Sequence, residues 1–340
     1  MKWQPLRRSP STPSPLMGGG CRGGSRTALT ETQVPNPYAF LRRTKRRAVS
    51  WVLLIGALLA LTMIFGADLR AAQIEDDRGQ VISLAASPQR IVSLYGGLTE
   101  ILMALGLKDR IVAHIQGDES LTNIPTVGTH LQPNVEMVLA LKPDLVVQGG
   151  VPKGMPALKK LESEGVPVAM FAPQDFKGLF SLIQRLGVLT GKGEAAAALN
   201  RGLEERLANV ARRLQGTRLV PVFFEVRYLN LLAAGRGSMV NDIITRAGGV
   251  NVVETAQRLA PFNLEALIQA QPEVYVIQQG PMNRSPEDIY TRPYFQELRA
   301  VKERRVLVVD EGLFSRPGPR SAEAVEQLAR FLHPEAWEKQ

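Results

Sequence analysis

Short apolar segments alternate with longer amphipathic segments between residues 88 and 175. The apolar segments have the length and composition of buried strands, and the amphipathic segments repeat their apolar residues with a helical period. A parallel sheet covered by helices on both faces produces this alternation. The pattern therefore predicts an α/β lobe over residues 88–175, with strands at 90–94, 110–114, 145–148 and 166–171 and helices at 99–105, 134–141 and 154–164.

The second half of the chain repeats part of this order. Residues 134–147 (NVEMVLALKPDLVV) align with residues 263–276 (NLEALIQAQPEVYV), and residues 99–106 align with residues 241–248. Two matched segments in the same order indicate two similar lobes, each a mostly parallel sheet flanked by helices. The second lobe is predicted over residues 217–336, with strands at 219–224, 274–277 and 306–309.

Residues 176–214 separate the two lobes and are predicted to be helical almost throughout, with one break at Gly191 and Gly193. The stretch after the break is rich in Ala, Leu, Glu and Arg, which are strong helix formers. We therefore expect a long, rigid helix to join the lobes and to permit only a small opening and closing.

An uncharged apolar segment, residues 48–67, follows a cluster of Arg and Lys between positions 42 and 47. Its length suffices to cross a membrane, and the basic flank is expected to stay in the cytoplasm. We predict a signal peptide, with an uncleaved inner-membrane anchor as the alternative, so that the lobes are exported. Residues 1–47 form a basic tail rich in Pro, Gly and Ser that is expected to be disordered, and Met17 is a second candidate start within it.

The net charge of +9 is confined to this tail, because residues 1–47 hold ten basic residues and one acidic residue while the remainder is balanced. A neutral folded region gives no reason to expect nucleic-acid binding. The single cysteine, Cys21, excludes an intramolecular disulfide and a cysteine-based zinc site. Three histidines are few for a resident metal site, and the chain shows no recognised nucleophile or phosphate-binding motif. A binding protein is therefore favoured over an enzyme.

Aromatic, polar and glycine residues follow the predicted strands in both lobes. Ligands of open α/β sheets bind outside the carboxyl ends of the strands, and glycine there allows close approach to the backbone. A cleft between the lobes is therefore predicted to be lined by Tyr95, Gly96, Gly97, His130, Gln132, Gln148, Glu225, Arg227, Tyr228, Gln278 and Arg316.

Glu136 and Glu265 occupy matched positions in the repeat, each two residues after an asparagine that reads as a helix N-cap. One interpretation is that each carboxylate complements the helix dipole. The other is that the two exposed carboxylates, one on each lobe, grip a pair of cationic pockets on a partner.

Several segments carry a resemblance to a known family. Residues 90–113 (RIVSLYGGLTEILMALGLKDRIVA), 134–147, 235–253 and 316–335 resemble the periplasmic solute-binding proteins of ABC importers, in the group for vitamin B12, ferric siderophores and haem. The resemblance extends over residues 88–335. It implies two α/β lobes joined by a long helix and a cobalt or iron chelate bound between them, with no resident cofactor. It also implies an inner-membrane permease dimer whose arginine pockets receive one glutamate per lobe, by motif match Glu136 and Glu265.

The chain departs from the family pattern at Tyr95-Gly96-Gly97, where relatives often carry proline, so a different pocket floor is expected. The related zinc and manganese binders use several histidines and a carboxylate, whereas here His333 lies near the C-terminus and leaves only His114 and His130. The sequence therefore predicts a non-catalytic, extracytoplasmic receptor for cobalamin, a ferric siderophore or haem. Two alternatives stay open, an envelope enzyme that uses Glu225 or Asp310 and a membrane-anchored sensor or scaffold.

Overall fold

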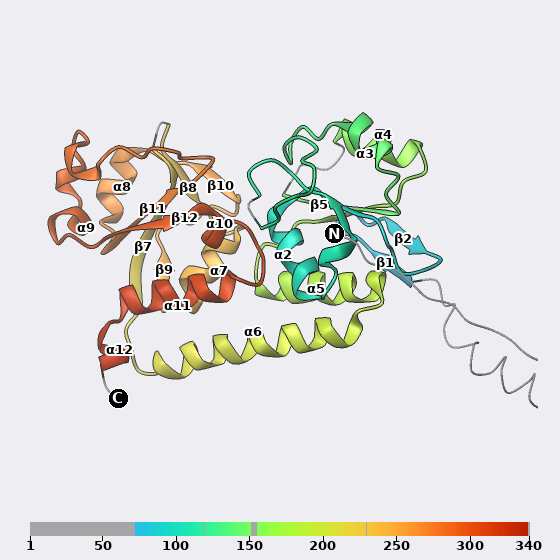
Figure 1. Cartoon of the computed structure of the whole chain (residues 1–340). Coiled ribbons are helices and arrows are strands. Elements are labelled where there is room, and N and C mark those ends of the chain that lie inside the picture. Colours follow the sequence, from blue (N-terminus) through green and yellow to red (C-terminus); the bar gives the residue numbers. More distant parts are fainter. Residues whose placement is uncertain (1–71, 119, 151–154, 229, 339–340) are drawn as a thin grey trace, which may run out of the picture. The chain divides into compact units, whose positions relative to one another are not determined.

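A computed structural model describes residues 72–118, 120–150, 155–228 and 230–338 (Figure 1). The basic tail and the predicted signal segment, residues 48–67, lie outside the described residues. Within the described ranges, no helix combines the length and the apolar character that crossing a membrane requires.

The N-terminal lobe is built on a parallel four-stranded sheet of order β4-β3-β5-β6. Alternate residues of the strands face opposite sides, so Val92 and Val146 pack beneath α3 and α4 while Ile91 and Leu145 pack against α2 and α5. The elements are β3 (Ile91–Ser93), α2 (Gly96–Ala104), the 3-10 helix η1 (Lys108–Arg110), β4 (Ile111–Ala113), α3 (Val135–Ala140), β5 (Leu145–Gly149), α4 (Pro156–Ser163) and β6 (Val168–Phe171).

The C-terminal lobe is built on a six-stranded sheet of order β10-β8-β7-β11-β12, with β9 also paired to β7. Strands β7, β9, β11 and β12 run parallel, whereas β8 and β10 are antiparallel additions that the sequence pattern did not predict. The elements are β7 (Val220–Arg227), β8 (Leu232–Ala234), α7 (Met239–Arg246), β9 (Gly249–Asn251), β10 (Leu259–Pro261), α8 (Leu264–Ala270), β11 (Val274–Gln279), η2 (Ile289–Thr291), η3 (Phe295–Glu297), α9 (Arg299–Lys302), β12 (Val306–Asp310), α10 (Glu311–Phe314), α11 (Ser321–Leu332) and α12 (Glu335–Glu338).

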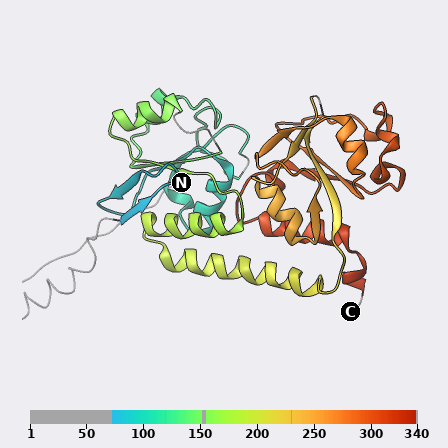
Figure 2. The same ribbon diagram turned by 180° about the vertical axis from the view of Figure 1, so that it is seen from behind.

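Two helices connect the lobes, α5 (Phe176–Thr190) and α6 (Gly193–Arg213), with the chain turning at Gly191. They lie antiparallel, and α6 runs beneath both lobes in the two opposite views (Figures 1 and 2). Arg206 on α6 forms two hydrogen bonds, of 2.8 and 2.9 Å, with Glu326 on α11. The predicted fold class, two α/β lobes joined by a long rigid helix, is confirmed.

The internal repeat also appears in the structure. The Asn134 side chain accepts a hydrogen bond from Met137 N at the start of α3, and the Asn263 side chain accepts one from Ala266 N at the start of α8. Each short helix leads into a central strand of its lobe, β5 or β11. The two lobes therefore place equivalent helix N-termini at equivalent points.

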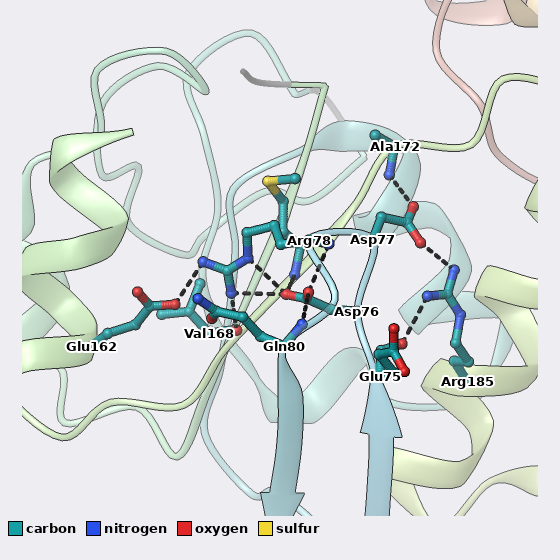
Figure 3. A network of polar contacts seen from close by, with 10 residues as sticks. Glu75, Asp76, Asp77, Arg78, Gln80, Glu162, Val168, Ala172 and Arg185 are labelled. Atoms are coloured by element: carbon teal, nitrogen blue, oxygen red, sulfur yellow. Dashed lines mark hydrogen bonds and ion pairs between the residues drawn. The ribbon is translucent and has the colours of Figure 1, made fainter. Parts of the chain in front are cut away.

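A hairpin that the sequence pattern did not predict precedes the first lobe. Its strands, β1 (Ala72–Glu75) and β2 (Val81–Leu84), are antiparallel, and Asp76 lies buried in the turn between them (Figure 3). The Asp76 carboxylate accepts hydrogen bonds from the backbone N–H groups of Arg78 (2.8 Å), Gln80 (3.1 Å) and Met170 (3.1 Å), and also from the Arg78 guanidinium (2.8 Å). The turn is thereby attached to β6 at the edge of the sheet.

Asp76→Asn is expected to lower the free energy of unfolding by about 1.5–3 kcal/mol, because an amide nitrogen would replace an acceptor oxygen and leave buried donors unpaired. Urea denaturation of the two proteins measures the difference. Asp109→Asn is the matched control, since Asp109 is exposed. A loss no larger than that of the control would contradict the role assigned to the turn.

Candidate functional site

A cleft of about 550 Å³ lies between the two lobes of the folded region. The N-terminal lobe lines it at the ends of β3, β4 and β5 and with the loop before α3. The C-terminal lobe lines it with the start of α7, residues 258–259, the loop after β11, Glu311 and residues 315–317. This is the place at which open α/β sheets bind ligands, at the carboxyl ends of parallel strands. Its size is within the ~300–1,000 Å³ that small-molecule sites usually have.

Tyr95 forms the aromatic wall of the N-terminal lobe. It lies two residues after the end of β3 and is the N-cap residue of α2. Its ring lies so close to the backbone at the end of β5 that a Cβ atom on Gly149 would come within 2.7 Å of it, and one on Gly150 within 2.8 Å. The edge of the ring meets His130, with ring centroids 6.1 Å apart. Gly149 and Gly150, at the end of β5, therefore make room for Tyr95.

The cleft carries an excess of positive charge. Arg258, Arg284 and Arg316 line it, and among the described residues none of the three forms an ion pair or a side-chain hydrogen bond. Among the described residues that line the cleft, Glu311 is the one acid, and its carboxylate accepts a hydrogen bond of 2.7 Å from Met282 N. Guanidinium groups left without partners in a concave site favour anionic ligands.

Burial and these arginines also shift the pKa values of Tyr95 and His130, the two aromatic side chains of the opposite wall. Burial raises the pKa of the Tyr95 hydroxyl above its ordinary value, although Arg258 and Arg316 oppose the shift. Burial lowers the pKa of His130, and the positive charges of Arg316 and Arg258 lower it further. His130 is therefore a neutral imidazole at pH 7, with one ring nitrogen able to accept a hydrogen bond or bind a metal.

Three of the residues predicted from strand ends line this cleft, namely Tyr95, His130 and Arg316. Gly96, Gly97, Gln132, Arg227 and Tyr228 lie outside its lining, and Tyr228 packs edge-on against Phe295, 5.6 Å between centroids. Ligand contact by these residues stays a prediction.

Gln148, Gln278 and Glu225 are fully buried next to the cleft and make bonds within the protein. Gln148 donates a 3.2 Å hydrogen bond to the carbonyl oxygen of His130, and the Gln278 side chain accepts one from Ser315. These two glutamines therefore support segments that line the cleft. Glu225 forms an ion pair with Arg292, 2.5 Å between Oε2 and Nη1.

Sequence reasoning missed Arg258, Arg284 and Glu311 as lining residues. Arg284 lies four residues beyond Gly280, so extending the strand-end rule along that loop finds it. Glu311 directly follows Asp310, which is exposed and caps α10 through a 2.8 Å bond from Leu313 N. Arg258 precedes an antiparallel strand that the pattern did not reveal, and we find no sequence signal for it.

Glu136 and Glu265 lie away from the cleft, in the first turns of α3 and α8. Both residues are exposed, and neither forms an ion pair within the described part of the chain. The two interpretations drawn from the sequence, dipole complementation and docking to a partner, are both compatible with this placement.

The family model named periplasmic binding protein matches residues 91–313, which include most of the cleft lining but not Ser315, Arg316 and Pro317. The chain belongs to this family. An ABC transporter substrate-binding lipoprotein of Bacillus subtilis, itself uncharacterized, is 28% identical over 87% of this chain and 100% of its own length. The vitamin B12-binding protein of Vibrio cholerae is 26% identical over 74% of this chain and 92% of its own length.

A solved structure shows the same fold. The periplasmic heme-binding protein RhuT of Roseiflexus sp. RS-1 in its apo form superimposes with a TM-score of 0.64 at 26% identity, over 73% of this chain and 99% of that one. The resemblance stated from the sequence motifs is thereby confirmed.

Proposed function

We propose that this chain is the exported receptor of an ABC importer and that it captures an anionic metal chelate between its lobes. Relatives named as ABC transporter, vitamin B12-binding and heme-binding proteins support the first part. The observation that carries the second part is the trio of unpaired arginines in the cleft, Arg258, Arg284 and Arg316. The metal arrives as part of the cargo, and the protein holds no resident cofactor.

The two walls have complementary tasks in this proposal. The arginines form charge-assisted hydrogen bonds with carboxylate or other anionic groups at the rim of the chelate. Tyr95 and the neutral His130 present oxygen and nitrogen atoms toward its body from the opposite lobe. Closing the cleft removes water from these contacts and strengthens them. Capture therefore needs both lobes.

After capture, the loaded receptor delivers its cargo to a permease dimer in the inner membrane, and it acts outside the cytoplasm without binding nucleic acid. Glu136 and Glu265 are its proposed docking residues. An enzyme on the same scaffold is not favoured, because neither Glu225 nor Asp310 lines the cleft. The other alternative, a membrane-anchored sensor or scaffold, requires that residues 48–67 are retained. The mass of the mature protein would show whether they are.

We expect hemin, with two carboxylates, to bind more tightly than cyanocobalamin, which carries no net charge. Each of Arg258→Met, Arg284→Met and Arg316→Met is expected to weaken hemin binding about 10- to 100-fold, as the loss of one charged hydrogen bond of ~1.5–3 kcal/mol implies. Isothermal titration of the full chain measures both affinities. Ferric enterobactin, a trianionic chelate, is the third probe and should respond to the same three changes.

Arg201→Met is the control, because Arg201 is exposed on α6, outside the cleft lining. Cyanocobalamin binding that is tighter than that of both anionic probes, and indifferent to the three changes in the cleft, would show that the cargo is not selected by its charge.

A further inference from the structure

The loop between α10 and α11 belongs to the C-terminal lobe but reaches the N-terminal lobe in both views (Figures 1 and 2). It comprises residues 316–320, Arg-Pro-Gly-Pro-Arg, and we call it the 316–320 strap. The middle of the strap, Pro317 and Gly318, is buried. Its two prolines restrict the backbone, so the strap is a stiff connection between the two arginines at its ends.

The strap lies directly against the start of α2. A Cβ atom on Gly97 would come within 2.2 Å of the Pro317 carbonyl oxygen, which no side chain tolerates. A Cβ atom on Gly318 would lie 3.4 Å from Gly97 Cα and 3.4 Å from Glu100 Oε2. The two lobes therefore meet here through backbone atoms, and Gly97 is required for their approach.

The far end of the strap is tied to α2 by an ion pair. Arg320 Nε and Nη2 donate hydrogen bonds of 3.0 and 2.8 Å to Glu100 Oε1. The near end places Arg316 at the cleft, where Nη1 would be 3.5 Å from a Cβ atom on Gly96. The Asp118 carboxyl carbon is also 3.5 Å from that point, so an acid of the N-terminal lobe borders the same space as Arg316.

Asp118 is buried, and its Oδ2 atom has no hydrogen-bond partner in the described structure. His114 Nδ1 is 3.8 Å from this oxygen and is likewise without a partner. A buried carboxylate oxygen without a partner is costly, and a nearby guanidinium offsets that cost. Asp118 and Arg316 border the same space at the N-terminal wall of the cleft, and the described structure has no ion pair between them.

We infer that Gly97 and the Glu100–Arg320 pair are positioning residues, which hold the 316–320 strap against the N-terminal lobe and thereby set Arg316 at the wall of the cleft. None of the three residues lines the cleft. The inference rests on the proposed function only where it concerns hemin affinity, because the position of the lobes is measurable without any ligand.

The ligand-free test uses spin labels on one exposed residue of each lobe, Lys159→Cys on α4 and Lys302→Cys on α9, in a Cys21→Ser background. Pulsed dipolar spectroscopy of the full chain gives the distribution of distances between the labels. Gly97→Ala is expected to lengthen or broaden it. Gly202→Ala on α6, where an added Cβ atom meets nothing within 4 Å, should leave it unchanged. An unchanged distribution in Gly97→Ala overturns the inference, whatever the cargo is.

The binding test uses hemin. Glu100→Gln is expected to weaken binding about 3-fold, the scale of an exposed ion pair, and Gly97→Ala about 10-fold, as when one charged hydrogen bond is lost. Both losses should vanish in an Arg316→Met background, because the positioning residues act through Arg316. The charge-swapped variant Glu100→Arg/Arg320→Glu should recover the wild-type affinity.

Glu164→Gln is the control, since it breaks an exposed ion pair with Lys160 within one lobe. Equal losses in the wild-type and Arg316→Met backgrounds would refute positioning through Arg316. A wild-type protein that binds no anionic probe would refute the proposed function instead, while the label distances still decide the positioning role.

Discussion

Arg292→Met is expected to lower the free energy of unfolding by about 3–5 kcal/mol, the usual cost of removing one partner from a buried ion pair. Arg292 and Glu225 are both 0% exposed, and their closest atoms are 2.5 Å apart. The variant would leave the Glu225 carboxylate in the core without its cation. Urea denaturation monitored by circular dichroism measures the loss.

The rest of the Arg292 environment makes the loss larger than that of a single contact. Its guanidinium also donates to the Glu287 carbonyl oxygen, at 2.8 and 3.1 Å, and lies 4.0 Å from the centroid of the Tyr228 ring. The Tyr275 hydroxyl donates a 2.6 Å hydrogen bond to Glu225. Burial, followed by the Glu225 charge, raises the pKa of Tyr275 well above its ordinary value, so this hydroxyl remains a donor.

Two comparison variants identify the cause of the effect. Arg299→Met removes a half-exposed arginine whose partners are Glu303 and Glu273 and should cost no more than ~1 kcal/mol. The double variant Arg292→Met/Glu225→Gln removes both charges and should recover part of the lost stability. If the double variant is less stable than Arg292→Met alone, an unpaired carboxylate is not what destabilises the single variant.

The same pair shows why part of the site escaped prediction. Strand-end position correctly indicated where a cleft forms, and Tyr95, His130 and Arg316 do line it. Whether a strand-end side chain faces ligand or core depends on distant partners, however. Glu225 turns inward because Arg292, 67 positions later, meets it there. No local pattern around Glu225 carries that information.

The fold was more predictable than the site for a related reason. Strands β3 to β7, β11 and β12 follow from local apolar periodicity, and the break near Gly191 follows from local composition. The hairpin of β1 and β2 has strands of only four residues each, and its apolar Val81 is exposed, so the local pattern is weak. The hairpin is held by the hydrogen bond from Met170 N to Asp76, a contact between residues far apart in the sequence. A local sequence pattern therefore does not predict it.

The largest functional effect is expected from Glu136→Ala combined with Glu265→Ala. The two carboxylates occupy matched helix starts on the two lobes and lie outside the cleft, so the double variant should bind hemin with unchanged affinity. Uptake should fall about 30-fold or more, because truncating a charge that becomes desolvated at an interface costs ~2–5 kcal/mol. The assay is uptake of labelled hemin by cells in which this receptor alone supplies the importer.

The control must remove the same charge from another exposed place. Glu204→Ala with Glu205→Ala does so on α6, where both residues are exposed. Long-range attraction to a cationic permease would be weakened equally in the two double variants, and only a specific contact separates them. Loss of uptake confined to the Glu136/Glu265 variant therefore assigns docking to the helix starts. Equal uptake by both variants would mean that Glu136 and Glu265 do not dock to the permease and only complement the helix dipoles. Their removal would then lower stability by ~0.3–1 kcal/mol each.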